Sequence, residues 1–383
     1  MLRGFALFGI LVVNIGYLAS AYHGTGAEQP GADGPLDVTV SALTSVFFEA
    51  KFFLLFSFLF GYSFTLQLAS AERRGARFVP RFLRRLLGLF VLGALHAVLL
   101  FPGDILTTYA VLGLVLLALH RIRPRAAVWT GVTLLAVTSV GYLLLAAAAA
   151  ATGSGGTDRA AAAADAARAT EALRGDAASV IGAHLDQLPD VAFLLAFFQA
   201  PAALAAFLFG LAAGRHRAIG RLDGHAPVLR RLQWAGFTVG LAGAVAYAYA
   251  STTSTTDAGQ LLALGIDVLT APLLAAAYAA TVLRAATGRH AERLAAVLAP
   301  AGRMALSAYL SQSLFCALLF TGYGAALSGR VPPSAVAAIA LVLFAAQAAA
   351  CRWWLDRHPY GPAEWTLRTW TNLSRPRWHG AAP

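Results

Sequence analysis

The chain has 383 residues, of which 58% are hydrophobic and only 12% are charged, and its mean hydropathy is +0.66. About a quarter of the residues in an ordinary soluble domain are charged, so a water-soluble enzyme is excluded. The apolar excess is the reverse of the disordered signature, and no heptad or collagen repeat is present. The composition therefore predicts an all-α membrane protein.

The net charge of +11 comes from 29 basic residues, all but one of which are arginines. A basic chain can bind nucleic acid, but these arginines cluster between apolar stretches, as they do at the cytoplasmic ends of membrane helices. The charge therefore indicates topology, and no nucleic acid partner is expected. Cys316 and Cys351 lie in apolar stretches and match no disulfide framework or zinc spacing, so buried thiols and no metal are expected.

A membrane-spanning helix needs roughly 20 predominantly apolar residues, and the sequence contains ten candidates. They are residues 4–22, 43–69, 86–101, 105–120, 127–151, 190–213, 233–250, 260–283, 304–322 and 334–351. The sequence thus predicts one transmembrane domain over 1–383, a polytopic helix bundle of about ten spans.

Threading these spans alternately places 24 arginines on the side of the N-terminus and four on the other. The positive-inside rule then predicts that both termini are cytoplasmic, N-in and C-in. An alternative for the N-terminus is a cleaved secretory signal, because the first apolar run ends in the small residues Ala19-Ser20-Ala21. Asn14 within that run and the nine later spans argue against it.

Two segments lie outside the predicted spans. Residues 152–189 are alanine-rich with scattered charges, and we expect an external loop or solvated surface helix there, not a second domain. Residues 352–383 are expected to form a cytoplasmic C-terminal tail.

Polar side chains are costly within a bilayer and usually face a bundle interior or a cavity, so each is a candidate functional residue. Most of those in or beside the predicted spans fall toward the external half: Asn14, His23, Glu49, Lys51, His96, Asp104, Asp267, Gln312 and Gln347.

Several of these candidates also have a purely structural explanation. Gln312 and Gln347 can bond helices to one another. Lys51 can extend its ammonium group to the membrane interface, and Asp104 can cap the helix that follows it. His96 has no second histidine at ligand spacing, so a metal site is not expected there.

Five short segments, in order along almost the whole chain, form a recognisable pattern. They are Arg3-Gly4-Phe5-Ala6-Leu7-Phe8-Gly9 running on to Asn14-Ile15, Lys51-Phe52-Phe53, His96 with Gly103-Asp104 and Tyr109, Gly302-Arg303-Met304-Ala305-Leu306-Ser307 with Gln312, and Gly361-Pro362-Ala363-Glu364-Trp365 with Arg368. Together they resemble the YeiB-like family of uncharacterised bacterial membrane proteins. The chain departs from the family pattern at Ala308, where an asparagine is expected. An aspartate that the family usually carries three residues before Arg3 would precede Met1, so we expect the natural start to lie upstream.

That family is similar in its first helices to membrane acyltransferases, including heparan-alpha-glucosaminide N-acetyltransferase. The resemblance implies transfer of an acyl group from cytoplasmic acyl-CoA to a hydroxyl or amine of a glycan, lipid or secondary metabolite. Asn14 follows Arg3 by eleven positions, as in the heparan enzyme, and His23 is the nearest candidate for its later catalytic histidine. His96, with Asp104 as its partner, is the other candidate base.

Under this hypothesis a cavity joins a rim of arginines to Asn14, whose amide donates to the thioester oxygen. The phosphates of CoA are expected to be held by guanidinium groups, which are Arg3, Arg84, Arg85 and Arg303. Contacts to the acceptor are expected from Glu49, Lys51, Tyr109 and Gln312.

Two other functions stay open at this point. A transporter or exporter of a small molecule would line its path with the same polar residues, although the two halves show no internal repeat. A lipid-binding scaffold would not need these residues clustered. The expected location is the bacterial inner membrane, the expected partners are membrane lipids and an acceptor, and a homodimer is left open.

Overall fold

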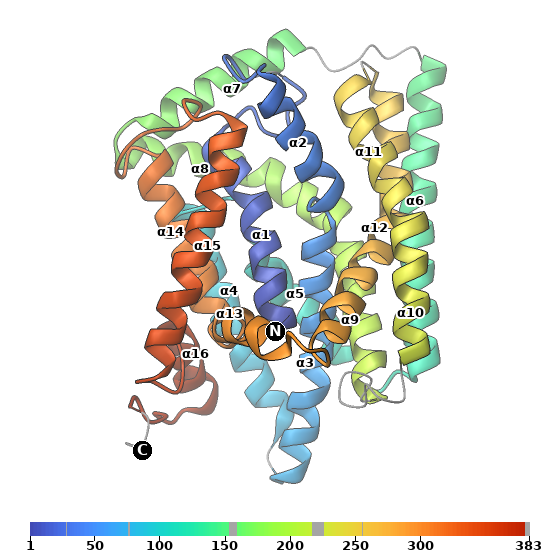
Figure 1. Cartoon of the computed structure of the whole chain (residues 1–383), viewed down its shortest axis with the longest axis vertical. Helices are drawn as coiled ribbons and strands as arrows, with labels where there is room; N and C mark the ends of the chain where they lie inside the picture. Colours follow the sequence, from blue (N-terminus) through green and yellow to red (C-terminus); the bar gives the residue numbers. More distant parts are fainter. Residues whose placement is uncertain (28, 76, 153–158, 217–225, 255, 380–383) are drawn as a thin grey trace.

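The computed structural model describes every residue except 28, 76, 153–158, 217–225, 255 and 380–383. The described residues form helices and connecting turns and include no strand. Most of the helices run between the same two ends of the molecule and form one bundle (Figure 1). The prediction of an all-α, polytopic helix bundle is therefore confirmed.

The helices of the bundle are α1 (Leu2–Ala19), α2 (Pro35–Phe47), α3 (Lys51–Arg73), α4 (Phe78–Leu99), α5 (Ile105–Ala118), α6 (Pro124–Thr152), α8 (Ala177–Leu194), α9 (Ala200–Arg215), α10 (Ala226–Ala235), α11 (Leu241–Thr253), α12 (Asp257–Ala285), α14 (Ala305–Phe320) and α15 (Pro333–Leu355). The π-helical turns Leu195–Gln199 and Gly236–Gly240 join α8 to α9 and α10 to α11. Three further helices lie across the ends: α7 (Arg159–Arg174), α13 (Ala291–Arg303) and α16 (Pro362–Asn372).

Seven helical stretches of the described residues are long and apolar enough to cross a membrane, and the pair α13–α14, bent by 81°, is an eighth candidate. This count is lower than the ten spans predicted. The two predicted spans outside it are α5, which has only 14 residues, and α10–α11, whose first half includes Arg230, Arg231 and Gln233. Length and hydropathy alone support seven or eight spans, and ten stays a prediction.

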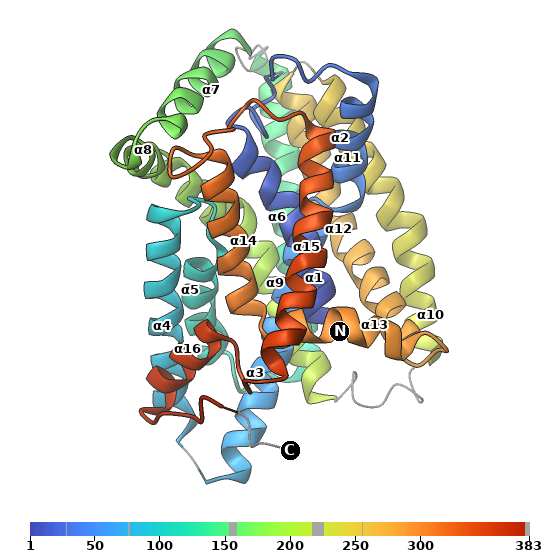
Figure 2. The same ribbon diagram turned by 60° about the vertical axis from the view of Figure 1, so that its left-hand side comes forward.

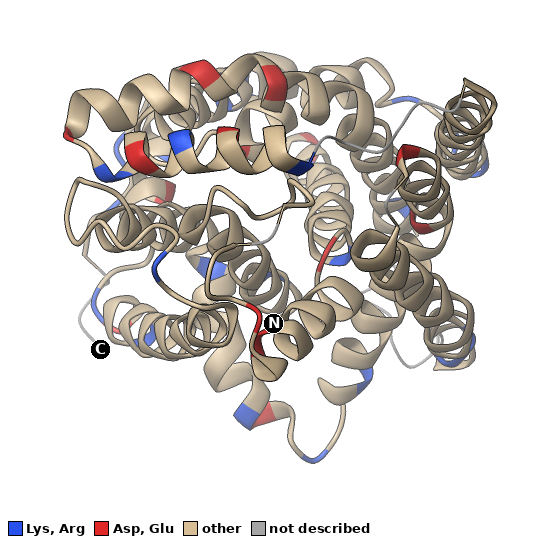
Figure 3. Ribbon diagram, turned by 90° about the horizontal axis from the view of Figure 1, so that it is seen from above, with Lys and Arg blue, Asp and Glu red and all other residues tan. Residues whose placement is uncertain are grey.

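Both termini lie at one end of the bundle and α7 lies at the other, as Figures 1 and 2 show. This arrangement agrees with alternate threading, and the assignment of the terminal end to the cytoplasm stays a prediction from the arginines. The external segment contains two helices where one was expected, because Asp176 starts α8 by accepting a hydrogen bond from Ser179 N at 2.9 Å. Seen from the end that carries α7, the positions of charged residues are few and scattered (Figure 3).

Glycines bring α3 and α9 into close contact. A Cβ atom on Gly61 would lie 2.0 Å from the carbonyl oxygen of Phe207, and one on Gly210 would lie 2.0 Å from that of Phe58. Lipid does not drive apolar helices together, so association in a bilayer depends on this kind of close approach at small residues.

We expect Gly61→Ala to lower the free energy of unfolding by about 3 kcal/mol, because the added methyl group meets a backbone carbonyl that cannot move aside. Gly141→Ala is the matched control, since nothing lies within 4 Å of the Cβ position at Gly141. Denaturant unfolding of both variants in detergent checks this expectation, and equal stabilities would contradict it.

The C-terminal segment is held against the bundle. Arg84 Nε donates to the carbonyl oxygen of Thr371 at 3.0 Å, and Trp370 Nε1 donates to that of Arg84 at 2.7 Å. These bonds fix α16 on α4, so the segment expected as a tail closes one side of the cavity described next.

Candidate functional site

A cavity of about 200 Å³ opens at the end of the bundle that carries the termini. It lies between α1, α3, α4, α5, α14 and α16, with the C-terminal end of α13 at its wall. The charged and polar side chains in its wall are Arg3, Ser63, Gln67, Arg85, Arg303, Glu364, Arg368, Tyr109 and Tyr309, and the rest of the wall is apolar or glycine. Along α3 the lining runs from Phe56 to Gln67, which corresponds to roughly 16 Å of helix.

The charges of this cavity are unbalanced. Arg3, Arg85, Arg303 and Arg368 line it, and Glu364 is the single carboxylate among its lining residues. Arg368 also lies over the ring of Tyr360, 4.2 Å from its centroid. Four guanidinium groups and one carboxylate leave an excess of positive charge that favours an anionic ligand.

The carboxylate of Glu364 is already engaged. It accepts hydrogen bonds from the backbone N–H groups of Leu306 and Ser307 at 2.7 and 3.2 Å, and from the hydroxyl of Ser307. Glu364 thereby caps the N-terminus of α14, where the chain bends sharply after α13. Since the carboxylate serves this cap, it is less available to neutralise the neighbouring arginines.

The arginines predicted to bind CoA divide into two groups. Arg3 donates to the hydroxyl of Ser63, and Arg85 has a buried Nε atom with no hydrogen-bond partner among the described residues. Arg303 is exposed at the mouth. Arg84, by contrast, does not line the cavity, because one residue of helical rotation turns it toward α16.

The inner part of the cavity is closed by tyrosines. The Tyr109 hydroxyl lies 2.7 Å from Ser57 Oγ and donates to the carbonyl oxygen of Phe53 at 3.1 Å. Its ring stacks against Phe56 at 6.1 Å between centroids. Tyr109 is therefore a rigid, uncharged surface at the inner end of the site.

Behind the second tyrosine lies a buried imidazole and carboxylate. His96 Nδ1 is 3.0 Å from Asp104 Oδ1, and both side chains are 1% exposed. The ring of Tyr309 lies 4.9 Å from that of His96, and its hydroxyl donates to Asp104 Oδ1 at 3.5 Å. Neither ring nitrogen of His96 makes a well-aligned hydrogen bond among the described residues. The pair has the composition of a general base with an orienting carboxylate.

Local sequence explains the placement of this pair. Asp104 caps α5, as its alternative interpretation predicted, by accepting a hydrogen bond from Thr107 N at 2.9 Å through Oδ2. The other oxygen, Oδ1, is left for His96. His184 of α8 lies over the turn through its contact with the carbonyl oxygen of Val98 at 3.0 Å, which shields the pair.

A second polar cluster lies toward the opposite end, at the junction of α2 and α3. Ala50 adopts a positive φ of 63°, and Lys51 N donates to the carbonyl oxygen of Glu49 at 2.8 Å across this tight turn. The turn directs the side chains on its two sides to different partners. Glu49 accepts from Ser45 Oγ at 2.8 Å and lies 4.0 Å from His23. Burial lowers the pKa of His23, and Glu49 partly opposes that effect.

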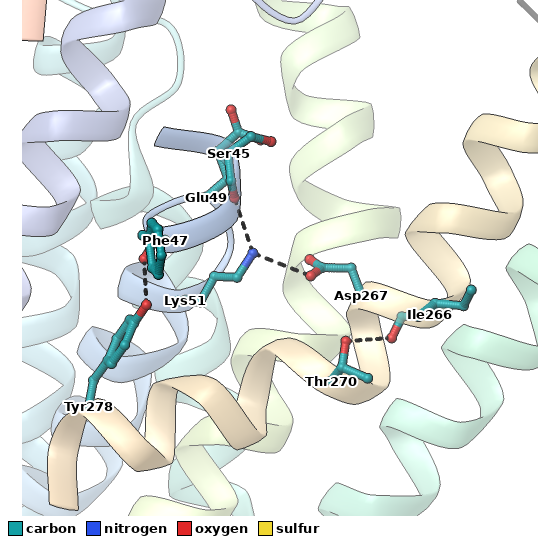
Figure 4. Close-up of polar contacts among 8 residues, drawn as sticks. All are labelled: Ser45, Phe47, Glu49, Lys51, Ile266, Asp267, Thr270 and Tyr278. Carbon is teal, nitrogen blue, oxygen red and sulfur yellow. Dashed lines mark hydrogen bonds and ion pairs between the residues drawn. The ribbon is translucent and has the colours of Figure 1, made fainter. Parts of the chain in front are cut away.

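Lys51 is completely buried. Its ammonium group donates to the carbonyl oxygen of Ser45 at 3.3 Å and to Asp267 of α12 at 3.4 Å (Figure 4). It also lies 5.7 Å from the centre of the Tyr247 ring. The alternative in which Lys51 extends to the membrane interface is wrong, because its side chain is 0% exposed and its charge is compensated inside the bundle.

Two further predicted site residues, Asn14 and Gln312, lie neither in the wall of the cavity nor in the polar cluster at the junction of α2 and α3. Asn14 does not line the cavity; it is one helical turn beyond Ile10, the last lining residue of α1, on the same face. Gln312 Nε2 donates to Gln347 Oε1 at 2.7 Å, a bond that joins α14 to α15. The cavity therefore does not reach Asn14, and His23 lies with Glu49, apart from His96.

The sequence patterns indicate no role for Tyr309. Glu364 and Arg368 appear only as parts of a motif. The feature that could have identified these residues is their position in the C-terminal segments that resemble the family. The sequence identifies Asp267 as a charged residue within a span, but it does not predict that Lys51 is its ion-pair partner. Among the described residues no group of three or more His, Cys, Asp or Glu side chains could hold a metal ion.

Comparison with known proteins identifies the family. Residues 213–374 match the family model described as "Protein of unknown function (DUF418)". The chain is 32% identical to the uncharacterised protein YxaH of Bacillus subtilis, over 98% of this chain and 93% of that protein. It is 28% identical to an uncharacterised 39.9 kDa protein of Bacillus acidopullulyticus, over 97% of this chain and 92% of that protein.

A third relative, the uncharacterised protein YeiB of Escherichia coli, is 35% identical over 37% of this chain and 36% of its own length. No solved structure matches the chain. None of these names states an activity. The similarity to YxaH extends over nearly the whole of both proteins, and the chain belongs to the YeiB-like DUF418 family of membrane proteins of unknown function.

Proposed function

We propose that this chain is an acyltransferase of the bacterial inner membrane that takes its acyl group from acyl-CoA. The observation that carries the proposal is the buried Arg85 Nε, which has no hydrogen-bond partner among the described residues and belongs to a wall with four arginines and one carboxylate. A buried guanidinium donor without a partner is costly. A phosphate group supplies the acceptor that it lacks.

The size of the cavity limits which part of the donor enters. Its volume of about 200 Å³ is a little larger than the engineered cavity of ~150 Å³ that binds benzene. It can hold a short acyl group and part of a narrow arm but not a nucleotide. The nucleotide therefore stays at the mouth near Arg303 and Arg368 and its phosphates reach Arg85, while the thioester lies toward Tyr109 and Tyr309.

The proposed base is His96, held by Asp104. The acceptor hydroxyl or amine attacks the thioester carbonyl carbon as its proton passes to an imidazole nitrogen of His96. The carbon–sulfur bond then breaks, and the departing sulfur takes that proton, which restores neutral His96. Since Tyr309 stands between His96 and the cavity, its side chain has to rotate for this step.

The acceptor, a hydroxyl or amine of a glycan, lipid or secondary metabolite, enters from the opposite end in this proposal. The polar cluster on that side consists of His23, Glu49, Lys51 and Asp267. On α1, Asn14 lies one helical turn beyond Ile10, which lines the cavity, and about one turn before Tyr17. This placement supports contact with the acceptor for Glu49, whereas Asn14, which the cavity does not reach, has no role at the thioester in this proposal.

One observation favours a transporter of a small anion as the second candidate. The pair α13–α14 is bent by 81° beside the cavity, and broken helices often form transporter binding sites. A transporter would bind the anion at the same arginines and form no new bond.

Binding of acetyl-CoA to purified protein tests the donor site. We expect Arg85→Gln to weaken binding by about tenfold to a hundredfold, because hydrogen bonds to charged groups contribute about 1.5 to 3 kcal/mol. Arg74→Gln removes the same charge from an exposed position between α3 and α4, outside the cavity, and is expected to change affinity less than twofold. Equal affinities for the two variants would refute the donor site, and binding without acyl transfer to any acceptor would favour the transporter.

A further inference from the structure

A second hollow lies outside the site described above, at the foot of α10 and α12. It has a volume of about 460 Å³ and is lined by Ala226, Pro227, Arg230, Arg231, Trp234 and Arg284. Three of the lining residues are arginines and none is acidic. The ends of α10 and α12 that carry the lining residues lie at the same end of the bundle as the two termini (Figure 1).

The arginines of this groove have no counter-charge among the described residues. None of the three forms an ion pair with a carboxylate in the part of the chain that the structure describes. Among the described residues, Arg284 donates to the side-chain oxygen of Gln233, which is neutral. The three guanidinium groups thus retain most of their donors for an external anion.

The frame that carries these arginines is rigid. A Cβ atom on Gly236 would lie 2.3 Å from the carbonyl oxygen of Leu273, so the π-helical turn that follows α10 touches the backbone of α12. Gln233 also donates to Thr281 Oγ1 at 2.8 Å across the same pair. Little backbone entropy is therefore lost when an anion binds between the two helices.

The surroundings of the groove point to a lipid as the source of the anion. Trp234 is 65% exposed beside the arginines, and Phe237, the next apolar side chain along this face, is 41% exposed. Tryptophan at the end of an apolar, lipid-facing helix is typical of the headgroup level of a membrane. Basic pockets between membrane helices at this level bind anionic headgroups.

We propose that Arg230, Arg231 and Arg284 form a binding site for the phosphate of an anionic phospholipid in the leaflet at this end. The phosphate lies among the three guanidinium groups, and the acyl chains run along the apolar surface past Phe237. This site is independent of the arginine-lined cavity and does not depend on acyl transfer.

Native mass spectrometry of the detergent-purified full chain tests the proposal with phosphatidylglycerol and phosphatidylcholine as probes. We expect the wild type to prefer phosphatidylglycerol. Replacing all three arginines with glutamine is expected to weaken its binding about a hundredfold, since each arginine near an anionic headgroup contributes roughly fivefold. The double variant R230Q/R231Q, which keeps the contact of Arg284 with Gln233, is expected to lose about 25-fold on the same basis.

The control variant R73Q/R74Q/R77Q removes the same charge from the α3–α4 hairpin, which projects from this end of the bundle (Figure 1). It is expected to bind phosphatidylglycerol as the wild type does. An equal loss in the control would show general charge attraction, and unchanged binding in both groove variants would show that the lipid binds elsewhere; either result overturns the site. Displacement of phosphatidylglycerol by inorganic phosphate at similar concentration would overturn the lipid as its ligand.

Discussion

Replacing Lys51 with methionine is expected to lower the free energy of unfolding by about 3 to 5 kcal/mol, the usual cost of removing one partner of a buried ion pair. Lys51 is 0% exposed, and the side chain of Asp267 is 7% exposed. Methionine fills a similar volume but leaves Asp267 as an uncompensated charge within the bundle. Denaturant unfolding in detergent measures the effect.

The double variant K51M/D267L separates the ion pair from simple packing. Because it removes both charges, it is expected to recover most of the lost stability. The exposed pair Arg168–Asp165, with side chains 74% and 67% exposed, is the control, and R168M is expected to change stability by less than about 1 kcal/mol. If K51M unfolds like the wild type, or if the double variant is no more stable than K51M, the charge compensation described above is incorrect.

The second large effect is expected in catalysis. If His96 is the base, His96→Ala should lower the rate of acyl transfer by at least about 100-fold, the lower end of the usual contribution of general base catalysis. His184→Ala is the matched control, since His184 is an equally buried neighbour that pairs with no carboxylate among the described residues. It is expected to retain transfer within tenfold. His23→Ala tests the other histidine predicted from the sequence. A larger loss of transfer rate in this variant would identify His23, at the opposite end of the bundle, as the general base.

Asp104 permits a finer test of the same mechanism. Asp104→Asn keeps a good N-cap for α5 but removes the charge that orients and stabilises the imidazolium. We expect a large loss of rate with little change in unfolding. Unchanged transfer in both His96→Ala and Asp104→Asn, in protein shown to be folded, would refute the proposed base.

The sequence by itself determined the class of the molecule. A composition of 58% hydrophobic residues excludes a soluble domain, and the arginine clusters predict one orientation because charged residues concentrate where the chain leaves the bilayer. Local rules also predicted that Asp104 starts a helix and that Gln312 and Gln347 can bond across helices. Each of these inferences depends on neighbours along the chain or on a property of the bilayer.

Only the tertiary structure decided which charges meet. Lys51 and Asp267 are 216 residues apart, and Glu364 caps a helix 57 residues earlier in the chain. Arg85 faces the cavity while Arg84 faces α16, although both look alike in sequence. The physical reason is that lipid and protein interiors are both apolar, so the pattern of a membrane helix does not reveal which face contacts a partner. Packing of distant helices sets that face, and with it the cavity, the buried ion pair and the pairing of His96 with Asp104.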